Sequence, residues 1–300
     1  MALDSELIND VATELNVDAS FIEKDYYAVK VVQAIADYSH SEITPIFSGG
    51  TSLSKGYGIL KRFSEDVDFR AQFKNGTRPT QGNLKAFRYE IYGLVESIEG
   101  ITLDKERRET GGNYFKIPLV YPQIADVSTA LRPHLQLDFS YTQVQRDPEE
   151  CSISSFVAEY SNSSPEARIL CLSPLETAAE KFSALIWRVN KRNRDDGQDD
   201  PAMIRHLHDL YVLRDYVHSH DKEFWAMVHT SAGTDENKLK RSTGMALPEA
   251  IKQMLDKLKR DKMYEEEYES FVLRMSYAKS QNLVSFGGAI DFLSKLTEKI

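Results

Sequence analysis

The stretch that decides the fold is FSGGTSLSKGYGILKRFSEDVDF (residues 47–69). It continues a short apolar strand pattern and turns at Gly49 and Gly50, where missing side chains leave room for a phosphate beside the main chain. Thr51 and Ser52 then supply hydroxyl groups at the start of an expected helix, whose free N–H groups attract anions. By itself, a Gly-Gly turn more often simply joins a strand to a helix.

The stretch ends in two carboxylates. Asp66 and Asp68 alternate with Val67 and Phe69 on an expected strand, so both carboxylates leave the same face. Such a pair repels unless a cation lies between its members, and a divalent ion with oxygen ligands is the natural candidate. The alternative is an ordinary solvated strand face.

A third carboxylate, Asp138, lies in the apolar strand pattern LQLDFSY. A buried carboxylate is costly unless it is paired. Asp138 is therefore either a third metal ligand on a strand beside Asp66 and Asp68, or it forms a salt bridge with a nearby arginine, or it lies on an exposed edge. Three carboxylates holding two Mg²⁺ ions beside a phosphate-binding turn would form a phosphoryl- or nucleotidyl-transfer site.

Composition limits the class of protein. The chain has 300 residues, enough for two modest domains, and a net charge of −9, so a nucleic acid must be met by a local basic patch. Cys151 and Cys171 are the only cysteines and form no CxxC motif, which fits a reducing cytoplasm. No apolar run reaches the length of a membrane span. We expect a cytoplasmic protein without a membrane partner.

Periodicity predicts an α+β first domain at residues 1–150, which begins with helices, and a helical second domain at residues 151–300. The expected strands are 43–48, 66–73, 101–108, 113–121 and 134–141. The expected helices are 5–15, 20–38, 51–60, 80–97, 173–193 and 201–217, with about four more after them. Asp18 and Asp200 are expected to be N-caps.

The order of these motifs resembles a known superfamily. A Gly-Gly turn, a short helix, an Asp-x-Asp strand and a later strand aspartate are similar to the DNA polymerase β-like nucleotidyltransferases. The fuller pattern, GGTSL…KRFSEDVDF after FIEKDYY, closely resembles the AbiEii/AbiGii family, the nucleotidyltransferase toxins of bacterial toxin–antitoxin and abortive-infection systems, which include the MenT toxins. Residues 181–188 match the family's K-[LF]-x-A-x-x-x-R motif, and residues 205–210 match R-x-x-x-D-[LI], with His206 replacing an acid. The resemblance covers residues 20 to 215.

The resemblance implies a small mixed-sheet, polymerase β-like core with a helical domain that contributes Lys181 and Asp209. It implies NTP as substrate, Mg²⁺ (or Mn²⁺) as cofactor, and three sets of site residues. The catalytic residues would be Asp66, Asp68, Lys181 and Asp209, with Asp209 as a base for the acceptor hydroxyl. The nucleotide-binding residues would be Gly49, Gly50, Thr51, Ser52, Arg62, Lys181 and Arg188. The metal ligands would be Asp66, Asp68 and Asp138.

Each of the helical assignments has a structural alternative. Lys181 and Arg188 are seven residues apart on one helix face, which suits phosphates or a solvated basic stripe equally. Asp209 could instead pair with Arg205, and Arg62 could balance Asp66 and its acidic neighbour.

The resemblance implies transfer of a nucleoside monophosphate to an acceptor hydroxyl and points to the 3′ end of tRNA as the acceptor, whose modification would block translation. It also implies a cognate antitoxin encoded nearby. The alternatives are a small-molecule nucleotidyltransferase and a nucleotide-binding protein without turnover. The candidate RNA contacts, for which a solvated helix face is the alternative, are Lys181, Arg188, Lys191, Arg192, Arg194, Lys238, Lys240, Arg241, Lys252, Lys257, Lys259, Arg260 and Lys262.

Overall fold

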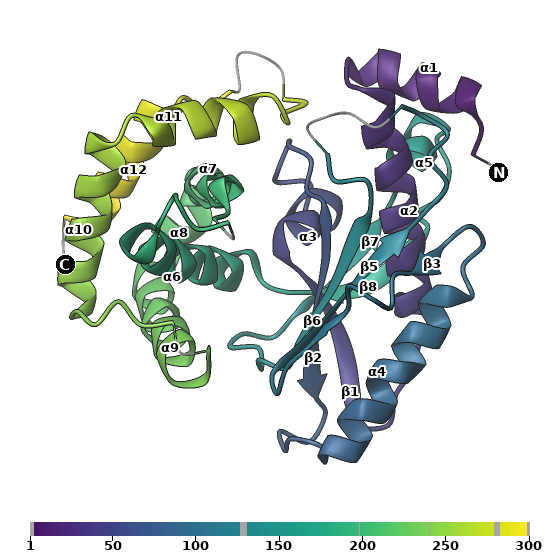
Figure 1. The fold of residues 1–300 in the computed structure, drawn as a ribbon, viewed down its shortest axis with the longest axis horizontal. Helices are drawn as coiled ribbons and strands as arrows, with labels where there is room; N and C mark the ends of the chain where they lie inside the picture. Colours follow the sequence, from purple (N-terminus) through teal and green to yellow (C-terminus); the bar gives the residue numbers. More distant parts are fainter. Residues whose placement is uncertain (1–2, 127–130, 198, 240, 279–282, 299–300) are drawn as a thin grey trace. The chain divides into compact units, whose positions relative to one another are not determined.

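The computed structural model describes residues 3–126, 131–197, 199–239, 241–278 and 283–298 (Figure 1). The chain forms two compact units: Met1–Gly58 with Phe63–Ser173, and Ile59–Arg62 with Pro174–Ile300. Lys181 and Asp209 lie in the second unit, which is helical. The first unit extends to Ser173, past the expected boundary after residue 150, because the short strands at 149–153 and 167–171 join its sheet.

The first unit contains a mixed sheet with the strand order β3-β5-β6-β2-β1-β8-β7, and β4 pairs with β5. β2 pairs with β6 and β1 pairs with β8 in parallel, whereas the other pairs are antiparallel. The strands are β1 Ile43–Ser48, β2 Asp66–Phe73, β3 Thr102–Leu103, β4 Glu109–Thr110, β5 Tyr114–Val120, β6 Leu135–Ser140, β7 Glu149–Ile153 and β8 Ala167–Cys171.

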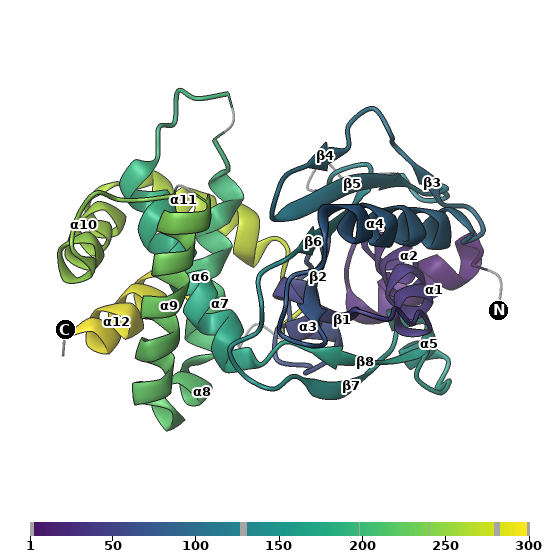
Figure 2. The same cartoon turned by 90° about the horizontal axis from the view of Figure 1, so that it is seen from below.

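The hydrophobic core of the unit lies on one face of this sheet. Four phenylalanines on neighbouring strands form a row across it, with ring centroids 4.8 to 5.4 Å apart: Phe47, Phe69, Phe139 and Phe115. Helices α2 and α4 cover this face (Figures 1 and 2) and bury the row completely. Because side chains alternate along a strand, the neighbouring positions point to the opposite face.

The helices of the first unit agree with the periodic patterns, except that the helix expected over 51–60 spans 49–55 and that the short helix over 156–160 was not expected. They are α1 Ser5–Leu15, α2 Ala19–Ala36, α3 Gly49–Lys55, α4 Gln81–Glu96 and α5 Phe156–Tyr160. The expected cap is confirmed, because the Asp18 carboxylate accepts the Ser20 N–H. The strand expected over 101–108 is cut to two residues, because the Asp104 carboxylate accepts the N–H groups of Glu106 and Arg107 and forms a turn.

The second unit is built around α6, which packs against α7, α9 and α10 (Figure 1). Its helices are α6 Pro174–Lys191, the 3₁₀ helix η1 Pro201–Ile204, α7 Arg205–Val212, α8 Arg214–Ser219, α9 Asp221–Leu239, α10 Leu247–Arg260, α11 Met263–Tyr268, the π-helix η2 Glu269–Leu273 and α12 Phe286–Thr297. The single helix expected over 201–217 is therefore three short ones. Asp200 makes no side-chain cap, because its carboxylate accepts the Arg188 guanidinium instead.

The segment Ile59–Arg62 belongs to this helical unit although it is close to β2 in sequence. Arg62 forms an isolated β-bridge with Ser276, and the Tyr277 hydroxyl donates to the Leu60 carbonyl at 3.1 Å. Leu60 is fully buried.

Among the residues that the structure describes, no helix has the length and apolar character that a membrane crossing needs.

Candidate active-site residues

The three aspartates predicted as metal ligands lie on one face of the sheet. Asp66 and Asp68 point away from the phenylalanine core on β2, and Asp138 of β6 lies directly opposite Asp68 in the parallel ladder. The alternating burial of both strands confirms that these side chains share a face.

A lysine extends this row onto the next strand. Lys116 of β5 is in register with Asp138, and its Nζ atom lies 2.7 Å from Asp138 Oδ2. The Gln136 amide donates to the other oxygen at 2.9 Å. Burial raises the pKa of Asp138 above its usual value, although Lys116 and this amide oppose the shift. Asp138 thus forms a salt bridge, with a lysine and not an arginine as its partner.

Asp66 also has a basic partner. Arg132, in the loop before β6, donates from Nη2 to Asp66 Oδ1 at 2.6 Å. Sequence analysis missed both Lys116 and Arg132, because a single basic residue in a strand or a loop carries no local signal of its partner.

The glycine turn lies against the Asp68 carboxylate. Gly49 has a φ of +74°, and a Cβ atom there would lie 2.1 Å from Asp68 Oδ2. No larger residue fits this position without moving the carboxylate. The hydroxyls of Thr51 and Ser52 do not project freely, because Thr51 donates to the Asp66 carbonyl and Ser52 donates to the Gly49 carbonyl at 3.2 Å. Both side chains are buried. Thr51 thereby connects α3 to β2, and Ser52 connects α3 to the glycine turn at its start.

Gly49→Ala should therefore impair the site without changing the charge of any residue. We expect activity to fall by about tenfold to a hundredfold, since the methyl group displaces Asp68 and misplacement by about 1 Å costs up to about 10²-fold. Gly76→Ala is the matched control, because Gly76 has a similar φ of +66° but open space around its Cα atom. If both variants lost activity equally in a transfer assay, the strain of a positive φ would explain the loss, and the displacement of Asp68 would not.

The donor set of this row suits a hard divalent cation, since it offers carboxylate oxygens alone. As the side chains stand, no group of three His, Cys, Asp or Glu residues within the described part of the chain is arranged to hold a metal ion. Arg132 and Lys116 each occupy one oxygen that such an ion would use. The chemistry of the row fits the cofactor, and binding would require these ion pairs to rearrange.

A second cluster of predicted residues lies inside the helical unit. Asp209 of α7 is fully buried and accepts Arg62 Nε at 2.8 Å and Arg62 Nη2 at 2.5 Å. Lys181 Nζ of α6 lies 2.8 Å from Asp209 Oδ2, and His208 Nδ1 lies 3.2 Å from Oδ1. Burial favours the neutral acid, but the two cations outweigh it and hold the pKa of Asp209 well below its usual range.

This geometry argues against two of the sequence assignments. A buried carboxylate with a depressed pKa and two cationic partners is a poor proton acceptor, so Asp209 does not suit a general base. Arg62 directs its guanidinium at Asp209, which makes it a structural partner of this carboxylate. The suggested Asp209–Arg205 pair also differs from the structure, where Arg205 Nε donates to the Ala202 carbonyl at 3.1 Å.

Lys181 keeps the properties of a phosphate ligand. Its ammonium group has three N–H donors, and one suffices for Asp209. Arg188 lies two helical turns further along α6 and pairs with Asp200 at 2.6 Å, with a third of its side chain exposed. His206 has its pKa held well below the usual value by burial and by the charges of Lys181 and Arg188, so it is neutral at pH 7.

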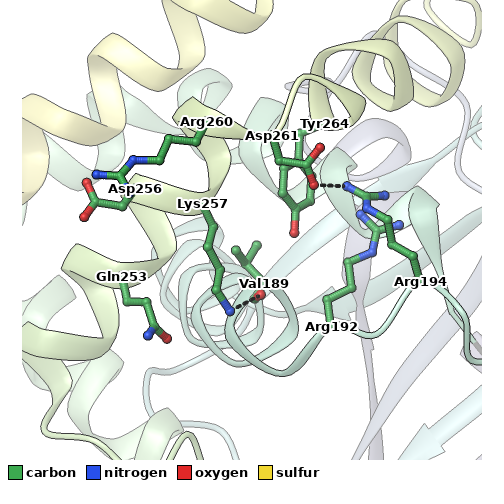
Figure 3. Close-up of a pocket in the computed structure, with 9 residues that line it drawn as sticks. All are labelled: Val189, Arg192, Arg194, Gln253, Asp256, Lys257, Arg260, Asp261 and Tyr264. Atoms are coloured by element: carbon green, nitrogen blue, oxygen red, sulfur yellow. Dashed lines mark hydrogen bonds and ion pairs between the residues drawn. The ribbon is translucent and has the colours of Figure 1, made fainter.

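Several candidate RNA contacts are instead part of an internal ion-pair network (Figure 3). Arg192, Arg194 and Asp261 of this network line a cavity of about 710 Å³. Arg192 pairs with Asp199 and Glu267 at 2.7 Å, and Arg194 pairs with Asp261 at 2.8 Å. Figure 3 also shows Lys257, whose ammonium donates to the Val189 and Asn190 carbonyls at the end of α6.

A second cavity on α6, of about 380 Å³, is lined by basic residues and by the carboxylates of Asp196, Asp199 and Asp200. Trp187 forms part of its wall, and the Arg241 guanidinium lies 5.2 Å from the indole ring. Within the described part of the chain, neither Lys191 nor Arg241 has an ion-pair partner. The side chains of Lys238 and Lys240 lie outside the described residues.

The mixed sheet, its carboxylate row and the following helical unit define a nucleotidyltransferase class of fold. The family model of the AbiEii toxins, nucleotidyl transferases of type IV toxin–antitoxin systems, matches residues 32–293, and the chain belongs to this family. The resemblance found in the sequence is thereby confirmed, as is the α+β fold. Membership implies transferase activity, an NTP substrate and an antitoxin partner.

A solved structure has the same fold. MenT4, a nucleotidyltransferase toxin from Mycobacterium tuberculosis H37Rv, superposes with a TM-score of 0.56 at 14% sequence identity. The alignment covers 97% of each chain. No curated protein sequence matches the chain significantly.

Proposed function

We propose that the chain transfers a nucleoside monophosphate from an NTP to an acceptor hydroxyl in a metal-dependent reaction. The observation that carries this proposal is the row of Asp66, Asp68 and Asp138 on one sheet face beside the Gly49 turn. An oxygen-rich row of this kind, next to a turn that excludes side chains, suits a metal-bound triphosphate.

The site residues have separable functions in this proposal. Asp66, Asp68 and Asp138 would hold Mg²⁺ (or Mn²⁺), which would supply charge stabilisation at the α-phosphate. Gly49 and Gly50 leave space for the phosphates, and their neighbours Thr51 and Ser52 fix the turn to β2.

The helical unit contributes basic groups to the same reaction. Lys181 donates its remaining N–H groups to the phosphates as a compact charge. Asp209, whose carboxylate is fixed by Arg62, holds that ammonium in place. Arg188 contacts the acceptor or the triphosphate, and the partly exposed guanidinium supports this assignment.

We further propose that the acceptor is RNA, specifically the 3′ end of tRNA, and that the protein acts in the cytoplasm with an antitoxin encoded nearby. The cavity at Trp187 supports an RNA acceptor, because an aromatic ring beside Lys191 and Arg241 combines base stacking with phosphate contacts. The contacts are few, so affinity should be modest and should fall with salt.

Replacing Trp187, Lys191 and Arg241 together by alanine should weaken RNA modification by about tenfold to a hundredfold, since one stacked base is worth about 1–3 kcal/mol. NTP binding should be unchanged. The control variant is Lys222→Ala with Lys295→Ala, which removes two exposed cations of α9 and α12 that are not among the candidate RNA contacts. If the triple variant labels tRNA at the parent rate, RNA docks elsewhere.

The acceptor is decided by incubating the protein with each NTP labelled at the α-phosphate, Mg²⁺ and total tRNA. We expect the label in tRNA. Label only in a small hydroxylated compound would favour a small-molecule nucleotidyltransferase instead. Tight NTP binding without any label transfer would leave a nucleotide-binding protein without turnover.

A further inference from the structure

Arg132 is held in place at both of its main-chain polar groups. Its N–H donates to Glu65 Oε1 at 2.7 Å, and its carbonyl accepts Lys24 Nζ at 2.8 Å. Lys24 and Glu65 also bond to each other at 2.9 Å, and both side chains are nearly excluded from solvent. Two buried charged groups that fix the backbone of one loop residue point to a required position for its side chain.

The other end of the same loop is fixed by the preceding residue of α2. The Glu23 carboxylate accepts the N–H groups of Ile124 and Ala125 at distances between 2.9 and 3.1 Å. Asp25, the next residue in α2, pairs with Lys55 at the end of α3 at 2.6 Å. The motif FIEKDYY thus places three consecutive charged residues on α2, two that bond to this loop and one that bonds to α3.

The guanidinium that this network places has unused donors. The Arg132 side chain is 40% exposed, and Nη2 donates to Asp66 Oδ1 at 2.6 Å. Within the described part of the chain, Nη1 has no hydrogen-bond acceptor in the protein. A planar guanidinium with free N–H groups suits a bidentate contact with phosphate oxygens. A phosphate bound at the metal of Asp66 would come within reach of these groups.

We propose that Arg132 is a phosphate-binding residue of this site, which contacts the triphosphate of the NTP and the pyrophosphate product. Glu23 and Lys24 are positioning residues, because they act through the loop that carries Arg132. The inference rests on the proposed function and assigns a contact that the sequence motifs do not contain.

The test measures binding of pyrophosphate, with Mg²⁺ and without turnover, by isothermal titration calorimetry. Arg132→Ala should weaken binding by about tenfold to a hundredfold, in the range of a lost charge-assisted hydrogen bond. Arg132→Lys should recover part of the loss. Arg107→Ala is the matched control, since Arg107 is an exposed arginine that also pairs with an aspartate, and it should bind as the parent does.

The positioning residues are tested by kinetics. Lys24→Met should raise KM for the NTP more than it lowers kcat, whereas a merely structural residue would lower the melting temperature and leave KM unchanged. If Lys24→Met does not fold, Glu23→Gln answers the same question, because the amide oxygen still accepts one loop N–H.

The outcomes separate the two proposals. Parent-like pyrophosphate affinity and KM in Arg132→Ala would reduce Arg132 to a counter-ion of Glu65 and Asp66 and would overturn the inference. Binding that depends on Arg132 without any transfer to an acceptor would overturn the proposed function alone. A parent protein that binds no pyrophosphate would overturn both.

Discussion

Asp68→Asn is expected to reduce nucleotidyl transfer by about a thousandfold, because the stabilisation that a bound metal gives amounts to several kcal/mol and each 1.4 kcal/mol is a factor of ten. The amide has nearly the shape of the carboxylate, so it fits beside Gly49 without a steric conflict. Melting temperature and circular dichroism should match those of the parent. The measurement is the initial rate of label transfer at saturating NTP.

Asp104→Asn is the control for this variant, since Asp104 is a carboxylate of the same unit in a turn away from the row. It should retain parent activity. Full activity of Asp68→Asn with an unchanged fold would remove the carboxylate row from the chemistry. The initial rate of Asp138→Asn tests in the same way whether Asp138, which pairs with Lys116, takes part in metal binding.

Asp209→Asn is expected to destabilise the helical unit by about 3–5 kcal/mol, because it leaves the buried cations of Arg62 and Lys181 without their common counter-charge. Transfer activity should fall with it, since Lys181 loses its anchor. Trp187 and Trp225, the two tryptophans of the chain, both lie in this unit, so their fluorescence during urea unfolding reports its stability directly.

The loss of stability caused by Asp209→Asn should depend on pH. The pKa of Asp209 is depressed in the folded state, so its stabilisation is fully present above the unfolded pKa of about 3.9 and declines as pH falls towards the folded value. The difference between parent and variant should therefore be constant from about pH 8 to 5 and shrink below about pH 4.

Asp215→Asn is the matched control, because Asp215 is largely exposed and its ion pair with Arg214 is long, at 3.8 Å. It should change stability by no more than about 0.5 kcal/mol. If Asp209→Asn unfolds like the parent but loses activity, Asp209 takes part in the chemistry as the sequence had suggested.

Local patterns in the sequence predicted the two strands that carry Asp66, Asp68 and Asp138. The alternation in DVDFRAQF and LQLDFSY predicted two strands and placed Asp66 and Asp68 on one face, because a period of two has only one structural outcome. That the two strands are neighbours was one of the alternatives considered for Asp138, and the family resemblance favoured it. No local pattern specifies which strands pair across about seventy residues of chain.

The errors of sequence analysis are tertiary in origin. The buried pair of Asp209 with Arg62 was not expected, because the two residues are 147 positions apart and their contact follows only from the packed helical unit. Arg192 and Arg194 read as exposed basic residues, yet acidic groups from another helix and from a loop pair with them. The strands EECSI and ARILC were missed because each is only five residues long.

The most direct test of the central claim compares two labels on the same NTP. The protein is incubated with Mg²⁺, tRNA and the NTP labelled at either the α- or the γ-phosphate, with Asp68→Asn in parallel. Nucleotidyl transfer predicts that the α-label enters RNA, that the γ-label leaves as pyrophosphate, and that the variant transfers neither. Entry of the γ-label into RNA, or equal α-label transfer by the variant, would contradict the account.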